Sequence, residues 1–240
     1  MNLAAALVML AACGGGSGGD EASATDPLDA GTIVGGSCSA VPANESGDGT
    51  YYAADGTGNC SFDASPNDLL VAAMNHPDYG DAVWCGACVN VTGPKGSVTV
   101  RIVDQCPECL KGSLDLSPQA FDMIADHAAG RVPITWHEVA CGVSGPIGYY
   151  FKAGDMQYYQ AIQIRNARYP VAKLEVMQGG AYIELVRADY NFFISPSGGL
   201  GNGPYAFRVT DQRGHALEDT GIALGSDLTR DGASQFDACP

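Results

Sequence analysis

The chain has 240 residues, of which 46% are hydrophobic and 32 are glycine, so it can form two ordinary domains rich in strands and tight turns. Its net charge of −15 argues against binding to nucleic acid, because that binding depends on Lys and Arg side chains that neutralise phosphates. The same charge opposes attraction to anionic wall polymers such as peptidoglycan, teichoic acid or pectin, whereas a neutral polysaccharide meets no such objection.

The first 13 residues, MNLAAALVMLAAC, form an apolar run that is too short to span a membrane and is typical of a signal peptide. The run ends in Leu10-Ala11-Ala12-Cys13, which resembles the lipobox of bacterial lipoproteins, with Cys13 as the lipidated residue. We therefore expect an exported protein that is either lipid-anchored at the cell surface through Cys13 or, alternatively, simply secreted. A membrane is expected as a partner only through that anchor.

Residues 14–45 begin with Gly and Ser and continue into an acidic, Ala-rich stretch, a composition typical of a flexible tether. Residues 46–141 are expected to form the first domain, made mostly of strands. Within it, residues 97–103 (SVTVRIV) alternate strictly between apolar and polar positions, which predicts a half-buried strand. Residues 134–140 (ITWHEVA) predict another strand.

Two short helices are expected in the first domain, each announced by a Ser-Pro pair. Ser65 would cap a helix that starts at Pro66 and continues through NDLLVAAM, and Ser117 with Pro118 would do the same for QAFDMIADHA. Ser at the N-cap and Pro at the first helical position are a recognised helix start.

The stretch 142–147 breaks the pattern with Gly and Pro and is the expected linker to a second domain over 148–240. In that domain, Gly-rich turns separate short runs of aromatic and β-branched residues. Six or seven short strands predict a small β-sandwich. The runs are 149–151, 159–164, 172–176, 182–186, 192–194 and 205–209.

Eight cysteines remain besides Cys13, an even number as a disulfide framework requires. They are Cys38, Cys60, Cys85, Cys88, Cys106, Cys109, Cys141 and Cys239. The pairs 85–88 and 106–109 also have the spacing of a four-cysteine zinc site, so zinc stays open as an alternative, although the exported context favours disulfides. The four histidines (His76, His127, His137 and His215) show no metal-site spacing and are expected at surface or structural positions.

Two carboxylates flank a Cys-Pro-Glu-Cys loop in residues 101–121, RIVDQCPECLKGSLDLSPQAF. Asp104 comes at the end of the predicted strand and Asp115 directly before the second predicted helix. Two carboxylates held close together are typical of clefts that handle glycans. The structural alternatives are that Asp115 supports the N-terminus of that helix and that Asp104 ends the strand in a turn.

An ordered set of motifs across both domains resembles that of microbial expansins, the proteins that loosen plant cell walls. In the first block the motifs are GTYY (49–52), CGAC (85–88), GPKG (93–96), VD (103–104) and LDLSP (114–118). In the second block they are AIQIRN (161–166), YPV (169–171), DYN (189–191) and RVTD (208–211). The resemblance implies a mostly β chain of two domains, a six-stranded double-psi β-barrel followed by an immunoglobulin-like, cellulose-binding β-sandwich.

The same resemblance implies a disulfide pattern and a groove. The implied disulfides are 60–85, 88–141 and 106–109, which leaves Cys38 and Cys239 to tie the two ends of the chain together. Asp115 corresponds to the essential aspartate of the barrel groove, the residue that related glycosidases use as the general acid. The groove would be lined further by Asp104, Thr50, Tyr52 and Glu108. Cys106 stands where other members carry an aromatic residue.

A catalytic base for hydrolysis is harder to find. Inversion needs a second carboxylate at about 6.5–9.5 Å from the acid. In hydrolytic relatives the base follows the segment that matches 50–52, but here Ala53 and Ala54 follow, and Asp55 precedes Gly-Thr-Gly as a turn residue does. We therefore favour wall loosening without hydrolysis. The alternatives are an endoglucanase or lytic transglycosylase that acts through Asp115, and a pure polysaccharide-binding or attachment protein.

In the second domain Tyr158, Tyr159 and Tyr190 match the planar aromatic strip of the family, with Lys152 as a candidate polar neighbour. Aromatic faces suit the apolar faces of pyranose rings. Adjacent residues of a regular strand point to opposite faces, so a core position for Tyr159 is the alternative. We expect a monomer that binds cellulose and other neutral β-glucans or xylan, with no metal or other cofactor.

Overall fold

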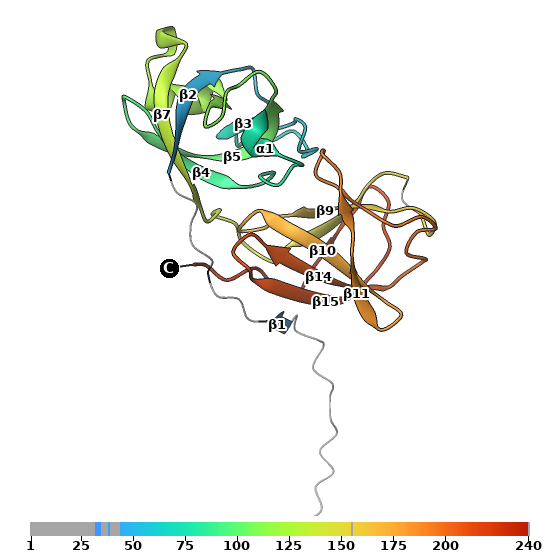
Figure 1. Cartoon of the computed structure of the whole chain (residues 1–240). Coiled ribbons are helices and arrows are strands. Elements are labelled where there is room, and N and C mark those ends of the chain that lie inside the picture. The colour runs from blue at the N-terminus through green and yellow to red at the C-terminus, as the bar shows by residue number, and fades with distance from the viewer. Residues whose placement is uncertain (1–31, 35–37, 39–43, 155, 240) are drawn as a thin grey trace, which may run out of the picture.

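The computed structural model describes residues 32–34, 38, 44–154 and 156–239, which form a β-barrel and a β-sandwich side by side (Figure 1). The expected signal peptide, the lipidated Cys13 and most of the expected tether lie outside the described residues. Within the described ranges, no helix has the length and apolar character needed to cross a membrane.

The first domain is a closed barrel with the strand order β2-β6-β3-β5-β4-β7. The pairs β2–β6 and β3–β5 are parallel and the other four are antiparallel. Large buried side chains such as Trp136, Phe121 and Met74 fill its core. The elements are β2 (Glu45–Tyr51), β3 (Val71–Asn75), α1 (His76–Tyr79), β4 (Cys88–Thr92), β5 (Ser97–Cys106), β6 (Leu114–Leu116), α2 (Pro118–Ile124), the 3₁₀ turn η1 (His127–Ala129) and β7 (Val132–Val139).

The first expected helix is wrong, because the run predicted as its body contains strand β3. All five residues of β3 are buried, and a strand covered on both faces is a continuous apolar run without the alternation that would reveal it. Ser65 and Pro66 form a turn, in which the backbone N–H of Asp68 donates to the Ser65 carbonyl at 2.9 Å. The second Ser-Pro pair does start a helix: Ala120 N–H donates to Ser117 Oγ at 3.2 Å.

The second domain packs two five-stranded sheets face to face, in the orders β1-β15-β14-β10-β11 and β12-β13-β9-β8-β16. Its core includes Tyr149, Phe151 and Phe207. The expected mostly-β fold class of a barrel followed by a sandwich is thereby confirmed. The strands are β1 (Thr32–Val34), β8 (Gly148–Phe151), β9 (Ala161–Arg165), β10 (Val171–Gln178), β11 (Ala181–Glu184), β12 (Val186–Arg187), β13 (Phe193–Ile194), β14 (Tyr205–Asp211), β15 (Ala216–Ile222) and β16 (Leu228–Asp231).

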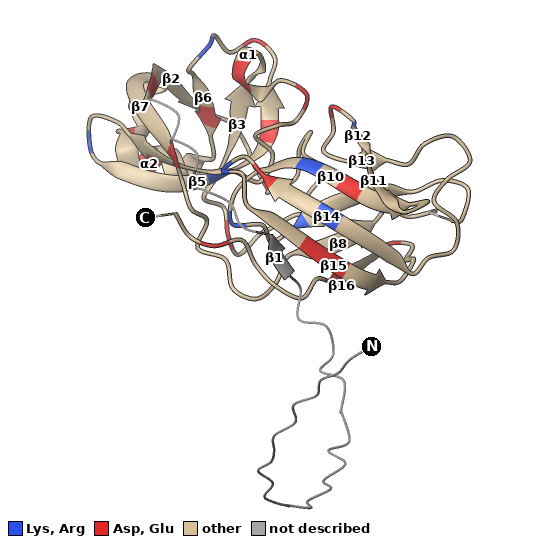
Figure 2. Cartoon of the chain, turned by 60° about the horizontal axis from the view of Figure 1, so that its bottom comes forward, with Lys and Arg blue, Asp and Glu red and all other residues tan. Residues whose placement is uncertain are grey.

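The outer face of the first of these sheets is polar. Acidic and basic residues alternate across β10, β14 and β15 (Figure 2). Glu175 accepts from Arg208 at 2.7 Å and lies 3.1 Å from the Lys173 ammonium, while Arg208 also lies 3.8 Å from Glu218. These charged residues make this face of the sandwich polar, as is usual for an antiparallel sheet with one face exposed to solvent.

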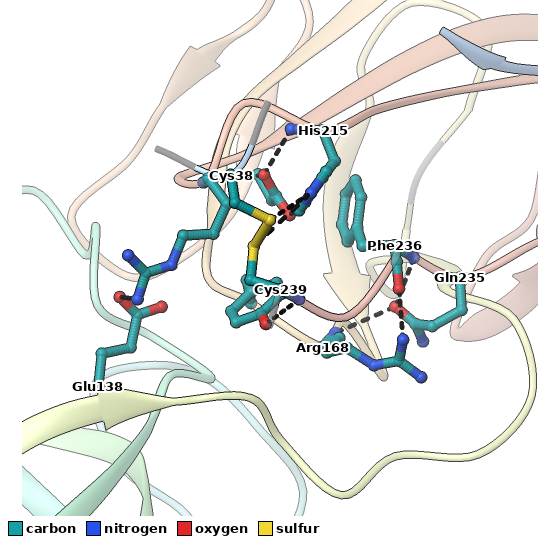
Figure 3. Close-up of polar contacts among 10 residues, drawn as sticks. Cys38, Glu138, Arg168, His215, Gln235, Phe236 and Cys239 are labelled. Atoms are coloured by element: carbon teal, nitrogen blue, oxygen red, sulfur yellow. Dashed lines mark hydrogen bonds and ion pairs between the residues drawn. A yellow bond between two sulfur atoms is a disulfide. The ribbon is translucent and has the colours of Figure 1, made fainter. Parts of the chain in front are cut away.

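Four disulfides join the pairs that the resemblance implies: Cys38–Cys239, Cys60–Cys85, Cys88–Cys141 and Cys106–Cys109. Because Cys85 and Cys88 bond to different partners, the two CxxC pairs do not form a four-sulfur zinc site. The Cys38–Cys239 bond lies against buried His215, whose Nε2 is 3.6 and 3.7 Å from the two sulfurs (Figure 3). The His215 Nδ1 pairs with Asp211 at 2.7 Å.

The chain segments before and after the barrel are both attached to the sandwich. After β7 the chain continues directly into the sandwich. Before β2, strand β1 pairs with β15 and Cys38 bonds to Cys239, so the segment that precedes the barrel is fastened to the sandwich. A buried ion pair between Arg213 of the sandwich and Glu138 of the barrel, 2.7 Å apart, closes the interface between these ties (Figure 3).

Candidate functional site

Four aligned residues form a row across neighbouring barrel strands. Thr50 of β2 pairs with Asp115 of β6, Asp115 pairs with Ala73 of β3, and Ala73 pairs with Asp104 of β5. Aligned residues on neighbouring strands project from the same face, and the residues on either side of Asp115 are in the core, so this carboxylate row faces outward. At about 4.8 Å per strand, the two acidic residues have Cα atoms roughly 10 Å apart, above the small floor that Ala73 provides.

A β-bulge places Asp104 in this row. The register between β3 and β5 shifts after Ala72, which pairs with Ile102, so that Ala73 pairs with Asp104 rather than with Val103. Without the shift, strict alternation would put Asp104 on the same face as the inward-pointing Ile102. Bulges re-aim side chains in this way and are common near functional sites.

The Asp115 carboxyl is half-buried and accepts a hydrogen bond from Thr50 Oγ1 at 2.5 Å. Burial raises the pKa of Asp115. The Thr50 hydrogen bond opposes this, the neighbouring carboxylates of Glu108 and Asp104 add to it, and Arg131 opposes it. Asp115 therefore keeps its proton to a higher pH than an exposed aspartate, which suits a hydrogen-bond donor or a general acid.

Asp104 is held by the loop that precedes β3. Its Oδ1 accepts from the backbone N–H groups of Asn59 at 2.7 Å and Gln105 at 2.8 Å. Gly58 approaches so closely that a Cβ on it would lie 2.4 Å from the Asp104 Cβ, and its φ of +158° is itself a conformation that favours glycine. Asp104 is thus a fixed hydrogen-bond acceptor at the edge of the groove.

Tyr52 lies amid the acidic residues of the groove. Burial, followed by the charges of Asp104, Asp115 and Asp55, raises the pKa of its phenol. Its hydroxyl is shielded from solvent and lies close to the Asp104 carboxylate, which contributes to the rise. Tyr52 therefore remains a neutral phenol and adds no charge to the groove.

The remaining carboxylates near the groove have different surroundings. Asp55 is exposed and accepts from the backbone N–H of Thr57 at 2.9 Å and from its hydroxyl at 2.5 Å, and these bonds lower the pKa of Asp55. A carboxylate with a lowered pKa is a weak base, and Asp55 has the turn geometry that its sequence context indicates. Glu108 is exposed on the loop that the Cys106–Cys109 disulfide closes.

The predicted aromatic residues lie in the connections between strands of the sandwich. Tyr158 and Tyr159 are 67% and 45% exposed, in the turn between β8 and β9, so the alternative of a core position for Tyr159 does not hold. Strand β9 begins only at Ala161, after an isolated bridge between Met156 and Tyr159. The alternation of a regular strand therefore does not separate the two tyrosines.

Lys152 and Tyr190 are neighbours. The Lys152 Nζ lies 5.0 Å from the centroid of the Tyr190 ring and 5.3 Å from that of Phe192. The centroids of the Phe192 and Tyr150 rings are 6.1 Å apart, and the Arg165 guanidinium lies over the Tyr150 ring, 3.7 Å from its centroid. The last three residues extend the aromatic cluster along the sheet and were not expected, because nothing in their local sequence separates them from ordinary strand residues.

Asn59 connects the groove to the aromatic cluster. Its backbone N–H holds Asp104, while its side-chain Nδ2 donates to Tyr79 Oη at 2.9 Å and to the Asp189 carbonyl at 2.8 Å. Tyr79 Oη donates to the same carbonyl at 3.0 Å, and Tyr190 is the next residue. Asn59 therefore places the carboxylate row beside the segment that carries Tyr190, across the two domains. Nothing in the local sequence indicates this role of Asn59, since Asp104 and Asp189 are 45 and 130 positions away.

Comparison with known proteins places this geometry in context. A family model described as "Lytic transglycolase" matches residues 71–136, within the barrel. The chain is 39% identical to Expansin-YoaJ of Bacillus subtilis over 163 residues, which cover 66% of this chain and 69% of that protein. It is 30% identical to Expansin-like protein 1 of Dictyostelium discoideum over 206 residues, which cover 79% of this chain and 71% of that one.

The solved structure of the apo expansin of Clavibacter michiganensis matches with a TM-score of 0.76 at 32% identity, and the match covers 82% of this chain and all of that one. A point mutant of the same protein, solved in complex with cellohexaose, matches with the same TM-score, identity and coverage. The match extends across the barrel and the sandwich together.

Proposed function

Because the chain belongs to the expansin family, we propose that it binds cellulose and weakens the contacts between polysaccharide chains without cutting them. The observation that carries this proposal is the contact through Asn59, which places the carboxylate row beside the segment that carries Tyr190. The cellohexaose complex of the Clavibacter relative supports a β-glucan as the ligand.

The aromatic surface would provide affinity without charge. The apolar faces of pyranose rings stack on Tyr158, Tyr159 and Tyr190, and Lys152 adds a donor for their hydroxyls. A neutral ligand also avoids repulsion from a chain with a net charge of −15. Cellulose, other neutral β-glucans and xylan share this chemistry. Because tyrosine offers a smaller platform than tryptophan, binding should be weaker than to a surface built on tryptophan.

The groove would act by exchanging hydrogen bonds. Asp115, protonated to a higher pH because burial raises its pKa, donates to an oxygen of the glucan. Asp104, held by two backbone N–H groups, accepts from glucan hydroxyls. Each such bond replaces one between neighbouring glucan chains, so a chain lying in the groove is released from its neighbours. No covalent step is needed for this action.

The surroundings of Asp55 and Asp104 make both carboxylates poor bases for hydrolysis. Hydrolysis needs a carboxylate that activates water on the far side of the glycosidic bond. Asp55 is engaged by both donors of Thr57, and Asp104 is engaged by two backbone N–H groups, so neither is presented as a free base.

Glycan cleavage is the second candidate function, and the family model described as "Lytic transglycolase" favours it. In that case Asp115 would protonate the leaving oxygen, and the Asp104 carboxylate, two strands away, would be one candidate for the second role. Such activity requires that the ligand draw Asp104 away from its backbone donors.

We further propose that the protein is an exported monomer anchored through Cys13. The tether would leave the body next to β1, at the edge of the sheet that does not carry the aromatic cluster. This placement supports a protein that faces the wall with its aromatic surface while its other sheet faces the cell, so it could also act in attachment.

The proposal is tested by measuring the release of reducing ends from amorphous cellulose over a long incubation. The exported, oxidised chain carrying Cys13→Ser is compared with the same chain carrying Asp115→Asn. No release from either protein, with both bound to the solid, supports the non-hydrolytic function, and wall creep is then the next assay. Release that disappears with Asp115→Asn would establish Asp115 as a catalytic acid and overturn the proposal.

A further inference from the structure

A cavity of about 560 Å³ lies between the barrel and the sandwich, separate from the carboxylate row. Its walls come from β5 at 99–101, from the loop that precedes β3, from the segment 141–144, and from the sandwich around 164–171, 191 and 193. The side chains that matter for its chemistry are Arg101, Asp68, Phe62 and Tyr169. The volume falls within the roughly 300–1,000 Å³ that is usual for small-molecule sites, and such sites occur preferentially between domains.

Arg101 provides a positive charge and hydrogen-bond donors at this cavity. Within the described residues its guanidinium makes no ion pair and no hydrogen bond, and its Nε is shut off from solvent. One face of the guanidinium lies over the Phe62 ring, 5.1 Å from the centroid, which leaves its N–H edge for a ligand. Burial lowers the pKa of Arg101, but a guanidinium stays charged in proteins.

Every other arginine in the described ranges donates to a carboxylate or to a backbone carbonyl. These contacts are Arg131–Asp48, Arg165–Asp63, Arg168–Phe236, Arg187–Ala82, Arg208–Glu175, Arg213–Glu138 and Arg230–Leu224. Burying a charge without a partner costs folding free energy. A half-buried arginine that has no ion pair or hydrogen bond among the described residues and lies beside an open cavity is the arrangement of a ligand site, because a ligand can supply the missing partner.

The charges around the cavity favour an anion that is small. The charges that act most on Arg101 are those of Asp68, which is exposed, and Arg165, a second guanidinium. The net charge of −15 repels an acidic polymer as a whole, but screening limits that repulsion to about 8 Å at physiological ionic strength. One carboxylate inside the cavity therefore meets Arg101 before it meets the bulk of the negative charge.

We propose that this cavity binds a hexuronic acid residue, with its carboxylate on the Arg101 guanidinium and its ring between the two domains. A carboxylate matches the planar fork of arginine in a two-point hydrogen bond, and Phe62 and Tyr169 offer aromatic walls for the ring. The choice of a sugar acid rests on the proposed function at polysaccharides, while the carboxylate rests on Arg101 alone. The site would recognise acidic branches or ends of wall glycans beside the neutral chain held by the groove.

The test is a titration of the oxidised Cys13→Ser chain with D-glucuronate, D-glucose and inorganic phosphate, followed by NMR and by calorimetry. Glucuronate should bind about 10- to 100-fold more tightly than glucose, the value of charge-assisted hydrogen bonds. Arg101→Met should remove that difference, Arg101→Lys should retain only part of it, and Asp68→Asn should strengthen binding. Arg230→Met, at an arginine outside the cavity that also has a buried Nε, is the matched control and should leave binding unchanged.

Thermal unfolding without ligand separates this role from a structural one. Because Arg101 has no hydrogen bond or ion pair to lose among the described residues, Arg101→Met should unfold at the same temperature as the parent or at a higher one. A clear fall in that temperature, equal binding of glucose and glucuronate, or equal binding by Arg101→Met and the parent would overturn the proposal. Phosphate bound as tightly as glucuronate would overturn the assignment to a sugar acid.

A cellulose pull-down of the same variants keeps the two proposals apart. Arg101→Met should bind cellulose as the parent does, whereas Tyr158→Ala should bind it less. Failure of glucuronate binding with intact cellulose binding would remove this inference and leave the proposed function untouched. Loss of cellulose binding by the parent itself would remove the proposed function.

Discussion

The groove and the domain interface each hold a carboxyl group whose pKa is raised by burial, and the two groups have opposite surroundings. Asp115 is half-buried on an open face, and the carboxylates nearest to it, Glu108 and Asp104, have the same sign as its own charge. Glu138 is 3% exposed and faces the guanidinium of Arg213 at 2.7 Å. Among the described residues, Asp115 has no ion-pair partner, whereas Glu138 has one.

This difference separates a ligand-binding site from a structural interface between domains. Like charges gathered on an accessible face are unfavourable to the folded protein and become useful only with a ligand. A paired charge in a closed interface has its partner within the fold and fixes the position of one domain on the other. A change in the groove should therefore affect activity much more than stability, and a change in the interface should do the reverse.

The largest effect on activity is expected from Asp115→Asn. Loosening, measured as creep of wall specimens or weakening of cellulose paper, should fall by at least about tenfold, because the amide cannot supply the strong O–H donor of a protonated carboxyl. The free energy of unfolding, measured in denaturant, should change by less than about 1 kcal/mol. Loosening equal to that of the parent would show that the barrel is inert and that the protein only binds.

The largest effect on stability is expected from Arg213→Met, which leaves Glu138 buried without its partner. At pH 7 this variant should lose about 3 kcal/mol, because breaking a buried pair strands the other charge. The loss should shrink at pH 5, where Glu138 can take up a proton at little cost. Both values come from denaturant unfolding at the two pH values.

The double variant Glu138→Gln with Arg213→Met is the control for this prediction. It removes both charges, so most of the lost stability should return. Cellulose binding should be unchanged in the single and double variants while they are folded, because neither residue contacts the groove or the aromatic cluster. A double variant as unstable as Arg213→Met would show that packing, rather than the stranded charge, causes the loss.

The sequence predicts the acids of the groove better than it predicts their support. Asp115 and Asp104 stand out because they flank a stapled loop, and the helix start at Ser117 is a local pattern that the structure retains. Alternation along β5 would nevertheless turn Asp104 inward, and only the bulge opposite Ala72 and Ala73 turns it outward. A bulge depends on the partner strand, which local periodicity cannot see.

A strand that is buried on both faces also escapes sequence prediction, because it lacks the alternation of apolar and polar residues. The Ser65-Pro66 pair predicts a helix over the run before Asn75, but tertiary packing makes the end of this run a barrel strand that is buried on both faces. Asn59 and Arg101 are single polar residues whose meaning comes from the other domain, through a carbonyl 130 positions away in one case and a shared cavity in the other. Neither could be distinguished from a surface residue in advance.

The smallest effect is expected in the pH dependence of stability, through the carboxyl group of Glu138. Burial raises the pKa of Glu138 from 4.5 to about 6, with Arg213 opposing the shift, so the folded state holds its proton more tightly than the unfolded state. This contribution to stability is full below pH 4.5 and is lost as the pH rises through 6; the shift corresponds to about 2 kcal/mol. Denaturant unfolding across this range should show the stability of the parent falling with pH relative to that of Glu138→Gln, which has no titrating group at this position and leaves Arg213 without its carboxylate partner at every pH. If the two curves stay parallel, the ion pair compensates Glu138 fully, and the interface then differs from the groove even more than its burial indicates.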